Sequence, residues 1–319
     1  MIVDVHSHLG DILNHNGGKL IEQTSVKKKR MFDPISLSEM ILHREFGFGD
    51  FFYRLLGRQV TLAERERNFT ATLENMSRSM NESGVTHTVC MPVPPYVTFE
   101  DLNAARLRDG RIIPFTGIDF TRDYDIDSTL RSDVARGARG LKLHPIIQNI
   151  PLIDKKTMKA VQSFSQFKLP VLFHCGYSSY YRGTEKSRQN TAYGEIWYAA
   201  ELVSSFPNVP FIAGHAGIFE VKDVIKMLAV YPNVYVDTSF QSPHRIRQLI
   251  KAFGPERVMF ASDWPYGNRI PGLKSVRAAS RGDRTLEDMI LWRNAEKLLD
   301  VQLQKRGSPR LKLVTKKIV

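Results

Sequence analysis

The sequence contains little cysteine and no long apolar segment. Its 319 residues include two cysteines, Cys90 and Cys175, and both lie in apolar runs typical of strands. Cysteines in such positions argue against a disulfide framework and favour a reducing compartment. No run approaches the roughly 18–20 apolar residues that cross a membrane, and no basic segment followed by an apolar stretch opens the chain. We therefore expect a cytoplasmic protein without a membrane partner.

Acidic residues are fewer than basic ones, 33 against 45, so the formal net charge is +12. The basic residues are dispersed, apart from a run at 27–30 and a basic C-terminal tail at 301–319. Neither run has the interleaved aromatic residues of a groove for single-stranded nucleic acid. We interpret the charge as a basic surface that attracts small anionic molecules, and we expect no nucleic-acid partner. The sequence does not determine the oligomeric state, and a homo-oligomer is one of the possibilities.

Histidine is scarce as well, with nine residues, which makes the positions of these residues informative. Two of them, His6 and His8, end the apolar run that opens the chain. Side chains at i and i+2 of a strand point to the same face, so both imidazoles can approach one metal ion. The pair alone is a weak signal, and the rest of the chain decides its meaning.

Short apolar runs alternate with helical patterns along the chain. Most of the runs are apolar throughout, which is typical of parallel strands covered on both sides. Eight βα units predict an α/β fold, a (β/α)8 TIM barrel that forms one domain over residues 1–300. A doubly wound sheet is the alternative, but no G-x-G-x-x-G follows the first strand. The expected strands cover residues 2–6, 87–91, 112–118, 140–144, 171–175, 210–215, 234–238 and 258–263.

The intervals between the strands carry helical spacing and helix end signals. An apolar stripe that starts at Phe69 predicts a helix that ends at Gly84. Asp154 is expected to cap the next helix after the fourth strand. Thr285 and Asp288 suggest a capping box for the C-terminal helix.

The segment 10–67 is far longer than an ordinary βα loop. In a barrel, an insertion after the first strand lies over the active-site face, so we interpret it as a lid or pocket wall. Its aromatic residues either line an apolar pocket or anchor the insertion to the barrel; they are Phe46, Phe48, Phe51, Phe52 and Tyr53.

Polar residues stand where the expected strands end, the edge at which barrel active sites lie. Burying so many polar groups without a cation would cost several kcal/mol, and a shared divalent metal would offset that cost. His6, His8, His174 and Asp263 supply nitrogen and oxygen ligands suited to Zn²⁺, which we expect, or to Mn²⁺, Fe²⁺ or Co²⁺. Asp263 could take a proton from a metal-activated water, and His215 could polarise a substrate carbonyl.

The order of these motifs resembles the amidohydrolase superfamily, and most of all its amidohydrolase-related branch. The resemblance covers residues 2–300 and rests on H-x-H at 6–8, G-x-K-x-H-P at 140–145, histidines after the fifth and sixth strands, S-D-x-P at 262–265 and a C-terminal helix at 291–299. It implies a divalent metal bound by His6, His8, His174 and Asp263, and a catalytic or second-metal role for His215. The branch contains hydrolases, lactonases and hydratases, and also non-oxidative decarboxylases of aromatic or unsaturated acids.

Two residues of the fourth strand, Lys142 and His144, share one face and have an ambiguous role. In some members of the superfamily a lysine on this strand is carboxylated and bridges two metals. Lys142 could instead be a buried positive group that pairs with Asp263, and either residue could bind a substrate carboxylate. Because His144 lies nearer the strand end, Lys142 sits deeper than a bridging lysine should. We therefore expect one metal ion.

Other candidate substrate contacts rest on position alone. Tyr177 and Arg182 follow the fifth strand and either contact the substrate or belong to a surface loop; an arginine would suit a carboxylate. Trp264 follows Asp263 and is expected to form an apolar wall. Asp4, two residues before His6, is expected on the same face, as a partner of a metal ligand or as part of the barrel floor.

Three functions are consistent with these residues. The first is a metal-dependent hydrolase that acts on a small carboxylate-bearing or aromatic molecule through a metal-activated water. The second is a metal-dependent non-oxidative decarboxylase, in which Asp263 or His215 protonates the ring carbon. The third is a barrel that binds a ligand without catalysis, which the complete polar set argues against.

Overall fold

The computed structural model describes residues 1–28, 32–42 and 56–301. Every strand pair in this part of the chain is parallel. The strands are β1 (Val3–Ser7), β2 (His87–Cys90), β3 (Ile112–Pro114), β4 (Thr116–Gly117), β5 (Leu141–Leu143), β6 (Val171–His174), β7 (Phe211–Gly214), β8 (Val234–Asp237) and β9 (Val258–Met259). The predicted strands are all present, several of them one or more residues shorter.

The strands follow one another around the molecule in sequence order. They pair as β1-β2-β3 and as β4-β5-β6-β7-β8-β9, and β3 and β4 are two parts of one strand position separated by Phe115. The Phe115 amide donates to the Cys90 carbonyl at 3.0 Å. At the other edge, the Val5 amide donates to the Phe260 carbonyl at 3.0 Å. The fold is the predicted (β/α)8 TIM barrel, and the sequential strand order excludes a doubly wound sheet.

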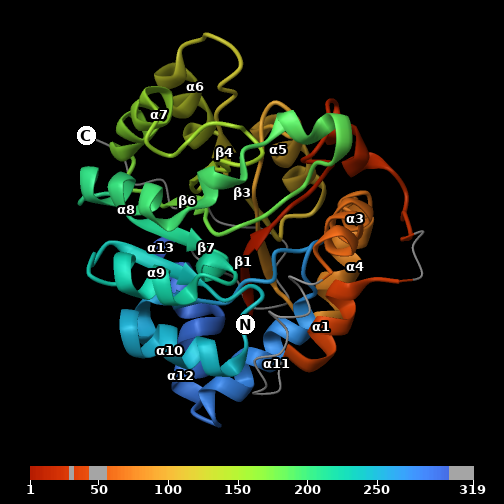
Figure 1. Cartoon of the computed structure of the whole chain (residues 1–319), viewed down its shortest axis with the longest axis vertical. Coiled ribbons are helices and arrows are strands. Elements are labelled where there is room, and N and C mark those ends of the chain that lie inside the picture. Colours follow the sequence, from red (N-terminus) through yellow and green to blue (C-terminus); the bar gives the residue numbers. More distant parts are fainter. Residues whose placement is uncertain (29–31, 43–55, 302–319) are drawn as a thin grey trace.

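Helices surround the strands, as Figure 1 shows with β1 near the centre of the molecule. The α-helices are α1 (Pro34–Leu42), α3 (Gly57–Asn68), α4 (Leu73–Ser83), α5 (Phe99–Arg108), α6 (Ile126–Ala135), α7 (Lys155–Ser165), α8 (Ile196–Ser205), α9 (Val221–Leu228), α10 (Pro243–Phe253), α11 (Arg269–Ser280), α12 (Arg284–Asp288) and α13 (Asn294–Leu298). Short 3-10 helices follow several strands, among them η2 (Gly183–Arg188) and η4 (His215–Gly217). No helix in the described ranges has the length and apolar character needed to cross a membrane.

Local capping chemistry explains where several helices begin and end. The Asp154 side chain accepts a hydrogen bond from the Lys156 amide at 2.8 Å and caps α7, as predicted. The helix predicted from Phe69 instead begins at Leu73, because the Thr72 side chain caps it. Gly84 ends this helix with a φ of 74°, a backbone conformation that glycine adopts without a Cβ clash.

The predicted capping box of Thr285 and Asp288 is wrong. The N-cap of α12 is Asp283, whose side chain accepts from the amides of Thr285 and Leu286. A π-helical segment, Met289–Arg293, then joins α12 to α13. The short polar side chain immediately before the helix makes the cap here, and no second bond to the N-cap amide completes a box.

One apolar cluster fills the barrel interior below the strand ends. Val89, Ile113, Leu172, Ile212 and Met259 come from five different strands and pack in the same cluster. Their neighbours in the strands pack outward against the helices. This layer closes the floor of the barrel, so the polar residues at the C-terminal strand ends lie above an apolar base.

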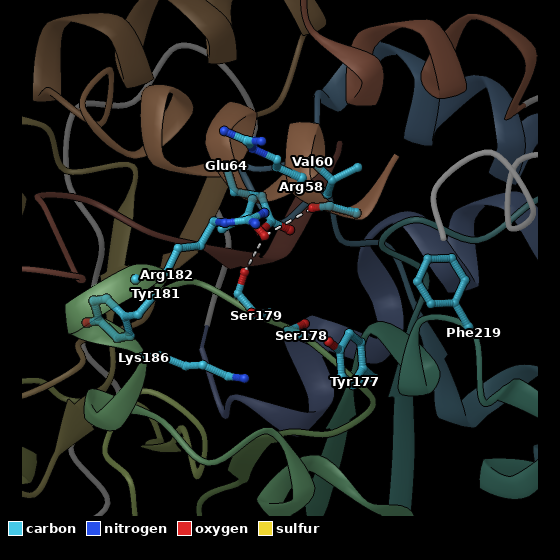
Figure 2. Close-up of a pocket in the computed structure, with 13 residues that line it drawn as sticks. Arg58, Val60, Glu64, Tyr177, Ser178, Ser179, Tyr181, Arg182, Lys186 and Phe219 are labelled. Atoms are coloured by element: carbon cyan, nitrogen blue, oxygen red, sulfur yellow. Dashed lines mark hydrogen bonds between the residues drawn. The ribbon is translucent and has the colours of Figure 1, made fainter. Parts of the chain in front are cut away.

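The insertion after β1 is anchored to the barrel by Arg67. This arginine at the end of α3 is fully buried and donates to Asp33, Glu39 and the Tyr266 carbonyl. Helix α3 also forms one wall of a cavity of about 460 Å³ at the strand ends (Figure 2). The interpretation of residues 10–67 as a lid stays a prediction. The aromatic residues expected to line a pocket or to anchor the insertion lie outside the described residues; they are Phe46, Phe48, Phe51, Phe52 and Tyr53.

Candidate metal centre

The predicted strand-end residues converge at one end of the barrel. His6 lies on β1, His8 follows it, and His174 ends β6. His215 and Asp263 follow β7 and β9, and both have a φ of 58°. Residues other than glycine rarely adopt this left-handed conformation, and such strain concentrates at functional sites. Each of the five residues is at most 6% exposed.

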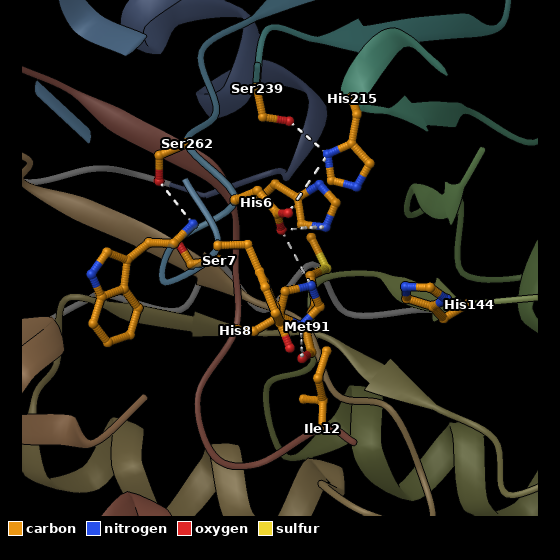
Figure 3. Close-up of polar contacts among 12 residues, drawn as sticks. His6, Ser7, His8, Ile12, Met91, His144, His215, Ser239 and Ser262 are labelled. Carbon is orange, nitrogen blue, oxygen red and sulfur yellow. Dashed lines mark hydrogen bonds and ion pairs between the residues drawn. The ribbon is translucent and has the colours of Figure 1, made fainter. Parts of the chain in front are cut away.

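Hydrogen bonds fix the orientation of His6, on β1, and of His8, which follows β1 (Figure 3). The Nδ1 atom of His8 lies 3.1 Å from the Met91 carbonyl, which can only accept, so Nδ1 carries the proton. The Nδ1 atom of His6 is 2.8 Å from Oδ2 of Asp237. Both histidines therefore keep an Nε2 lone pair for the centre of the site, the arrangement that metal-binding histidines adopt.

Asp263 lies against both of these Nε2 atoms. Its Oδ1 atom is 3.6 Å from Nε2 of His6 and 3.5 Å from Nε2 of His8. Two ligands that lie about 2.1 Å from a tetrahedral metal ion are about 3.4 Å apart. This carboxylate oxygen has no hydrogen-bond partner within the described ranges although it is buried. The unsatisfied oxygen and its distances fit a divalent cation.

His215 completes a compact group with His6 and Asp263. One ligand atom from each of the three residues lies within 4.8 Å of the others. The His215 ring stacks on His6 with centroids 4.6 Å apart, and its Nδ1 atom is 2.8 Å from Oγ of Ser239. The sequence resemblance implied a catalytic or second-metal role for His215, and the geometry leaves both roles available to it.

His174 stands at the side of this group, next to His144. The two rings stack with centroids 4.3 Å apart, and the His174 ring is 5.1 Å from that of His215. Its Nε2 atom is 3.2 Å from the Gly176 carbonyl, and its buried Nδ1 atom has no partner among the described residues. His174 lies outside the compact group of three, so its assignment as a ligand stays a prediction. His144 has different contacts: its Nδ1 accepts from the Ile147 amide, and its Nε2 lies 3.4 Å from the Tyr180 hydroxyl.

Lys142 extends from β5 into the same region. Its Nζ atom is 2.9 Å from Nε2 of His6, the nitrogen that would bind a metal ion. Burial lowers the pKa of Lys142 to about 8, against the opposing charges of Asp263 and Asp237. Metal binding at His6 must displace this contact, because a cation and an ammonium group compete for one lone pair.

Burial also sets the charge of the histidines. It lowers the pKa of His174 to about 3, and it lowers the pKa values of His6, His8, His144 and His215 well below 6.5, with Lys142 adding to each shift. Burial raises the pKa of Asp263 well above its usual value. The rings are therefore neutral at pH 7, the form in which imidazole binds a metal.

The remaining predicted contacts lie further from the group. Tyr177 and Arg182 are exposed and line the 460 Å³ cavity. Trp264 is buried and packs under the Arg269 guanidinium, 5.1 Å from its ring centroid. The expectation for Asp4 is wrong: the register of β1 shifts between Asp4 and Ser7, and Asp4 binds Arg269 at 3.0 Å instead of facing the histidines.

Sequence reasoning missed Asp237, Ser239 and Glu64. Asp237 ends β8, and its carboxylate contacts both His6 and Ser239. A rule that searches every apolar strand for a terminal ionisable residue would have found Asp237. Glu64 carries no such signal, because the long insertion brings it to the site from α3.

Comparisons with known proteins agree with the geometry. Residues 58–301 match the family model described as "Amidohydrolase". No curated protein sequence matches the chain. Among solved structures, similar folds include an uncharacterised TIM-barrel protein from Bordetella bronchiseptica, with 16% identity, a TM-score of 0.62 and coverage of 94% of this chain and 98% of that one.

Several similar structures have a described activity, and two of them illustrate the range. One is a 5-carboxyvanillate decarboxylase from Novosphingobium aromaticivorans with manganese and a nitrobenzoic acid, at 14% identity, a TM-score of 0.61 and coverage of 94% and 96%. The other is a probable 2-pyrone-4,6-dicarboxylic acid hydrolase from Acinetobacter baumannii, at 14% identity, a TM-score of 0.56 and coverage of 94% and 99%. At such identities the likeness concerns the fold. The family model, which covers more than half of the sequence, shows that this chain belongs to the amidohydrolase family of metal-dependent enzymes.

Proposed function

We propose that this protein is a metal-dependent hydrolase that acts on a small, anionic or aromatic molecule. The observation that carries the proposal is the position of Asp263. Its free carboxylate oxygen lies 3.5–3.6 Å from the metal-facing nitrogens of His6 and His8. A carboxylate so placed can both hold a metal ion and take a proton from a water molecule beside it. A bound divalent ion would polarise a substrate carbonyl and lower the pKa of a water.

The chain's own residues divide the remaining tasks. His6, His8, His174 and Asp263 would hold the ion, and Zn²⁺ suits this set of neutral nitrogens and one carboxylate, with Mn²⁺, Fe²⁺ or Co²⁺ as alternatives. The Ser239 hydroxyl donates to Asp237 and therefore accepts from Nδ1 of His215, so the neutral His215 ring presents an Nε2 lone pair. Once Nε2 has taken up a proton, His215 would donate a hydrogen bond to the oxygen on which negative charge develops. Asp263 would then return its proton to the leaving group.

Hydrolysis of a panel of lactones, esters and amides by the metal-loaded enzyme tests this proposal. We expect turnover of at least one class, and loss of turnover in Asp263→Asn with an unchanged melting temperature. Full activity of Asp263→Asn would contradict the role of this residue as proton carrier. If the protein takes up no metal during reconstitution, both metal-dependent reactions are contradicted, and a barrel that binds a ligand without catalysis is favoured.

A non-oxidative decarboxylase is the second candidate. It is favoured by the similarity to the solved structures of 5-carboxyvanillate and 2,6-dihydroxybenzoate decarboxylases. In that reaction the substrate carboxylate leaves as carbon dioxide, and Asp263 or His215 would deliver a proton to the ring carbon. If the enzyme releases carbon dioxide from hydroxybenzoates and hydrolyses none of the lactones, esters and amides, its activity is decarboxylation and not hydrolysis.

A further inference from the structure

The 460 Å³ cavity beside the metal centre has two unlike walls. One wall is α3, which contributes Arg58, Val60 and Glu64. The other is the segment that follows β6, from Tyr177 to Lys186. A volume of this size accommodates a small organic molecule. The cavity is therefore large enough to hold the part of a substrate that extends beyond the metal centre.

Basic side chains outnumber acidic ones around this cavity. Arg58, Arg182 and Lys186 line it, against Glu64 as the one acidic lining residue in the described part of the chain. Figure 2 shows Arg182 and Lys186 extending from the same segment, Arg182 toward α3 and Lys186 below it. Neither Arg182 nor Lys186 forms an ion pair with any residue that the structure describes.

The acidic residue between these two cations in sequence is already paired with other arginines. Glu185 lies between them in sequence, but its carboxylate binds Arg65 at 2.7 Å and Arg188 at 2.8 Å. The bond to Arg65 also joins η2 to α3, so it fixes the two walls of the cavity relative to each other. The positive charge of Arg182 and Lys186 is therefore left for a ligand, in a cavity that is already formed.

The inner end of the cavity adjoins the metal centre. Tyr180 lies between the lining residues Ser179 and Tyr181, and its ring centroid is 6.4 Å from that of His174. Ser178, which lines the cavity, lies four residues after His174 in the segment that leaves β6. The cavity therefore lies next to the metal centre on the side of His174, where the far end of a bound molecule could reach Arg182 and Lys186.

We propose that Arg182 and Lys186 bind a second anionic group of the substrate, so that the enzyme selects elongated dianions such as dicarboxylates. The proposal rests on the proposed function in one respect: the first end of the substrate is taken to bind at the metal centre. Guanidinium and ammonium groups form charge-assisted hydrogen bonds with carboxylates, and a partly enclosed cavity screens them less than open water does.

Calorimetric titration of the metal-loaded enzyme with matched probes tests this inference. The probes are benzoate against isophthalate, and 3-phenylpropanoate against the longer 3-(4-carboxyphenyl)propanoate. We expect at least one dicarboxylate to bind on the order of tenfold more tightly than its monocarboxylate. This gap in affinity should shrink as the salt concentration rises. The double variant Arg182→Gln/Lys186→Gln should abolish the gap, and Lys251→Gln, an exposed lysine at the end of α10, should keep it.

Equal affinities within both pairs would overturn the proposal, as would a gap that survives in the double variant. Both side chains are exposed, so a melting temperature equal to that of the wild type is expected and checks the fold. The measurement needs no turnover, which separates the two proposals. An inactive protein that still binds the dicarboxylate more tightly than the monocarboxylate would contradict only the hydrolase. An active enzyme that binds both with equal affinity would contradict only the second anion site.

Discussion

The Nδ1 atom of His6 lies 2.8 Å from Oδ2 of Asp237, and both side chains are fully buried. The two residues are 231 positions apart in sequence and come from β1 and β8. A carboxylate in this position fixes the histidine tautomer and raises the basicity of the other ring nitrogen. Asp237 is therefore a positioning residue for the proposed metal ligand.

Replacing Asp237 by asparagine should weaken metal binding by about 10- to 100-fold, the usual effect of losing such a partner. The reason is that an amide does not hold the Nδ1 proton of His6 as a carboxylate does. Competition with a metal chelator measures the affinity. Asp133→Asn is the matched control, since it removes a buried carboxylate that binds Thr116 instead. An Asp237→Asn affinity equal to that of the wild type would show that this contact has only a structural role.

Metal content should be one ion per chain in the wild type and in Lys142→Met. The ammonium group, 2.9 Å from Nε2 of His6, competes with a cation, so the variant should bind its ion more tightly. Elemental analysis and chelator competition give both values. Two ions in the wild type, one of them lost in Lys142→Met, would instead identify Lys142 as a carboxylated bridge.

His174 and His144 form a matched pair for testing the ligand set, because both are buried and their rings stack. His174→Gln should lower metal affinity at least about tenfold, since a neutral imidazole ligand is lost. His144→Gln should change the affinity far less, because its Nδ1 already accepts from the Ile147 amide. The opposite order in the same chelator assay would assign the ligand to His144.

His87, at the start of β2, should make the fold sensitive to acid. Burial lowers its pKa from 6.5 to about 4, so the unfolded chain takes up a proton at higher pH than the folded one. Its contribution to stability is complete above pH 6.5 and is lost as the pH falls toward 4, to a total of about 3 kcal/mol.

The free energy of unfolding, measured in denaturant from pH 7 to pH 4, checks this contribution. The curve of His87→Gln should fall less steeply than that of the wild type over this range. The exposed His15→Gln serves as the control. Parallel curves for His87→Gln and the wild type would mean that His87 is protonated equally in both states.

Patterns within single elements were readable in the sequence. The alternation of apolar strands and helices predicts the barrel, and the strand ends predict His6, His8, His215 and Asp263 as neighbours, which they are. These features depend on periodicity and on the rule that parallel strands share one edge. The same alternation wrongly placed Asp4 on the face of His6, because a register shift in β1 interrupts it.

The tertiary structure decided the contacts between elements that are distant in sequence. The pairing of Asp237 with His6, the placement of Lys142 against His6 and the fixing of η2 to α3 by Glu185 and Arg65 follow no local pattern. The sequence by itself determined the barrel and the edge at which its polar residues gather, because hydrophobic periodicity and strand direction are local properties. Only the folded chain decides which histidine nitrogen faces the candidate metal site and which cationic side chains have no carboxylate partner among the described residues, because both depend on packing between distant segments.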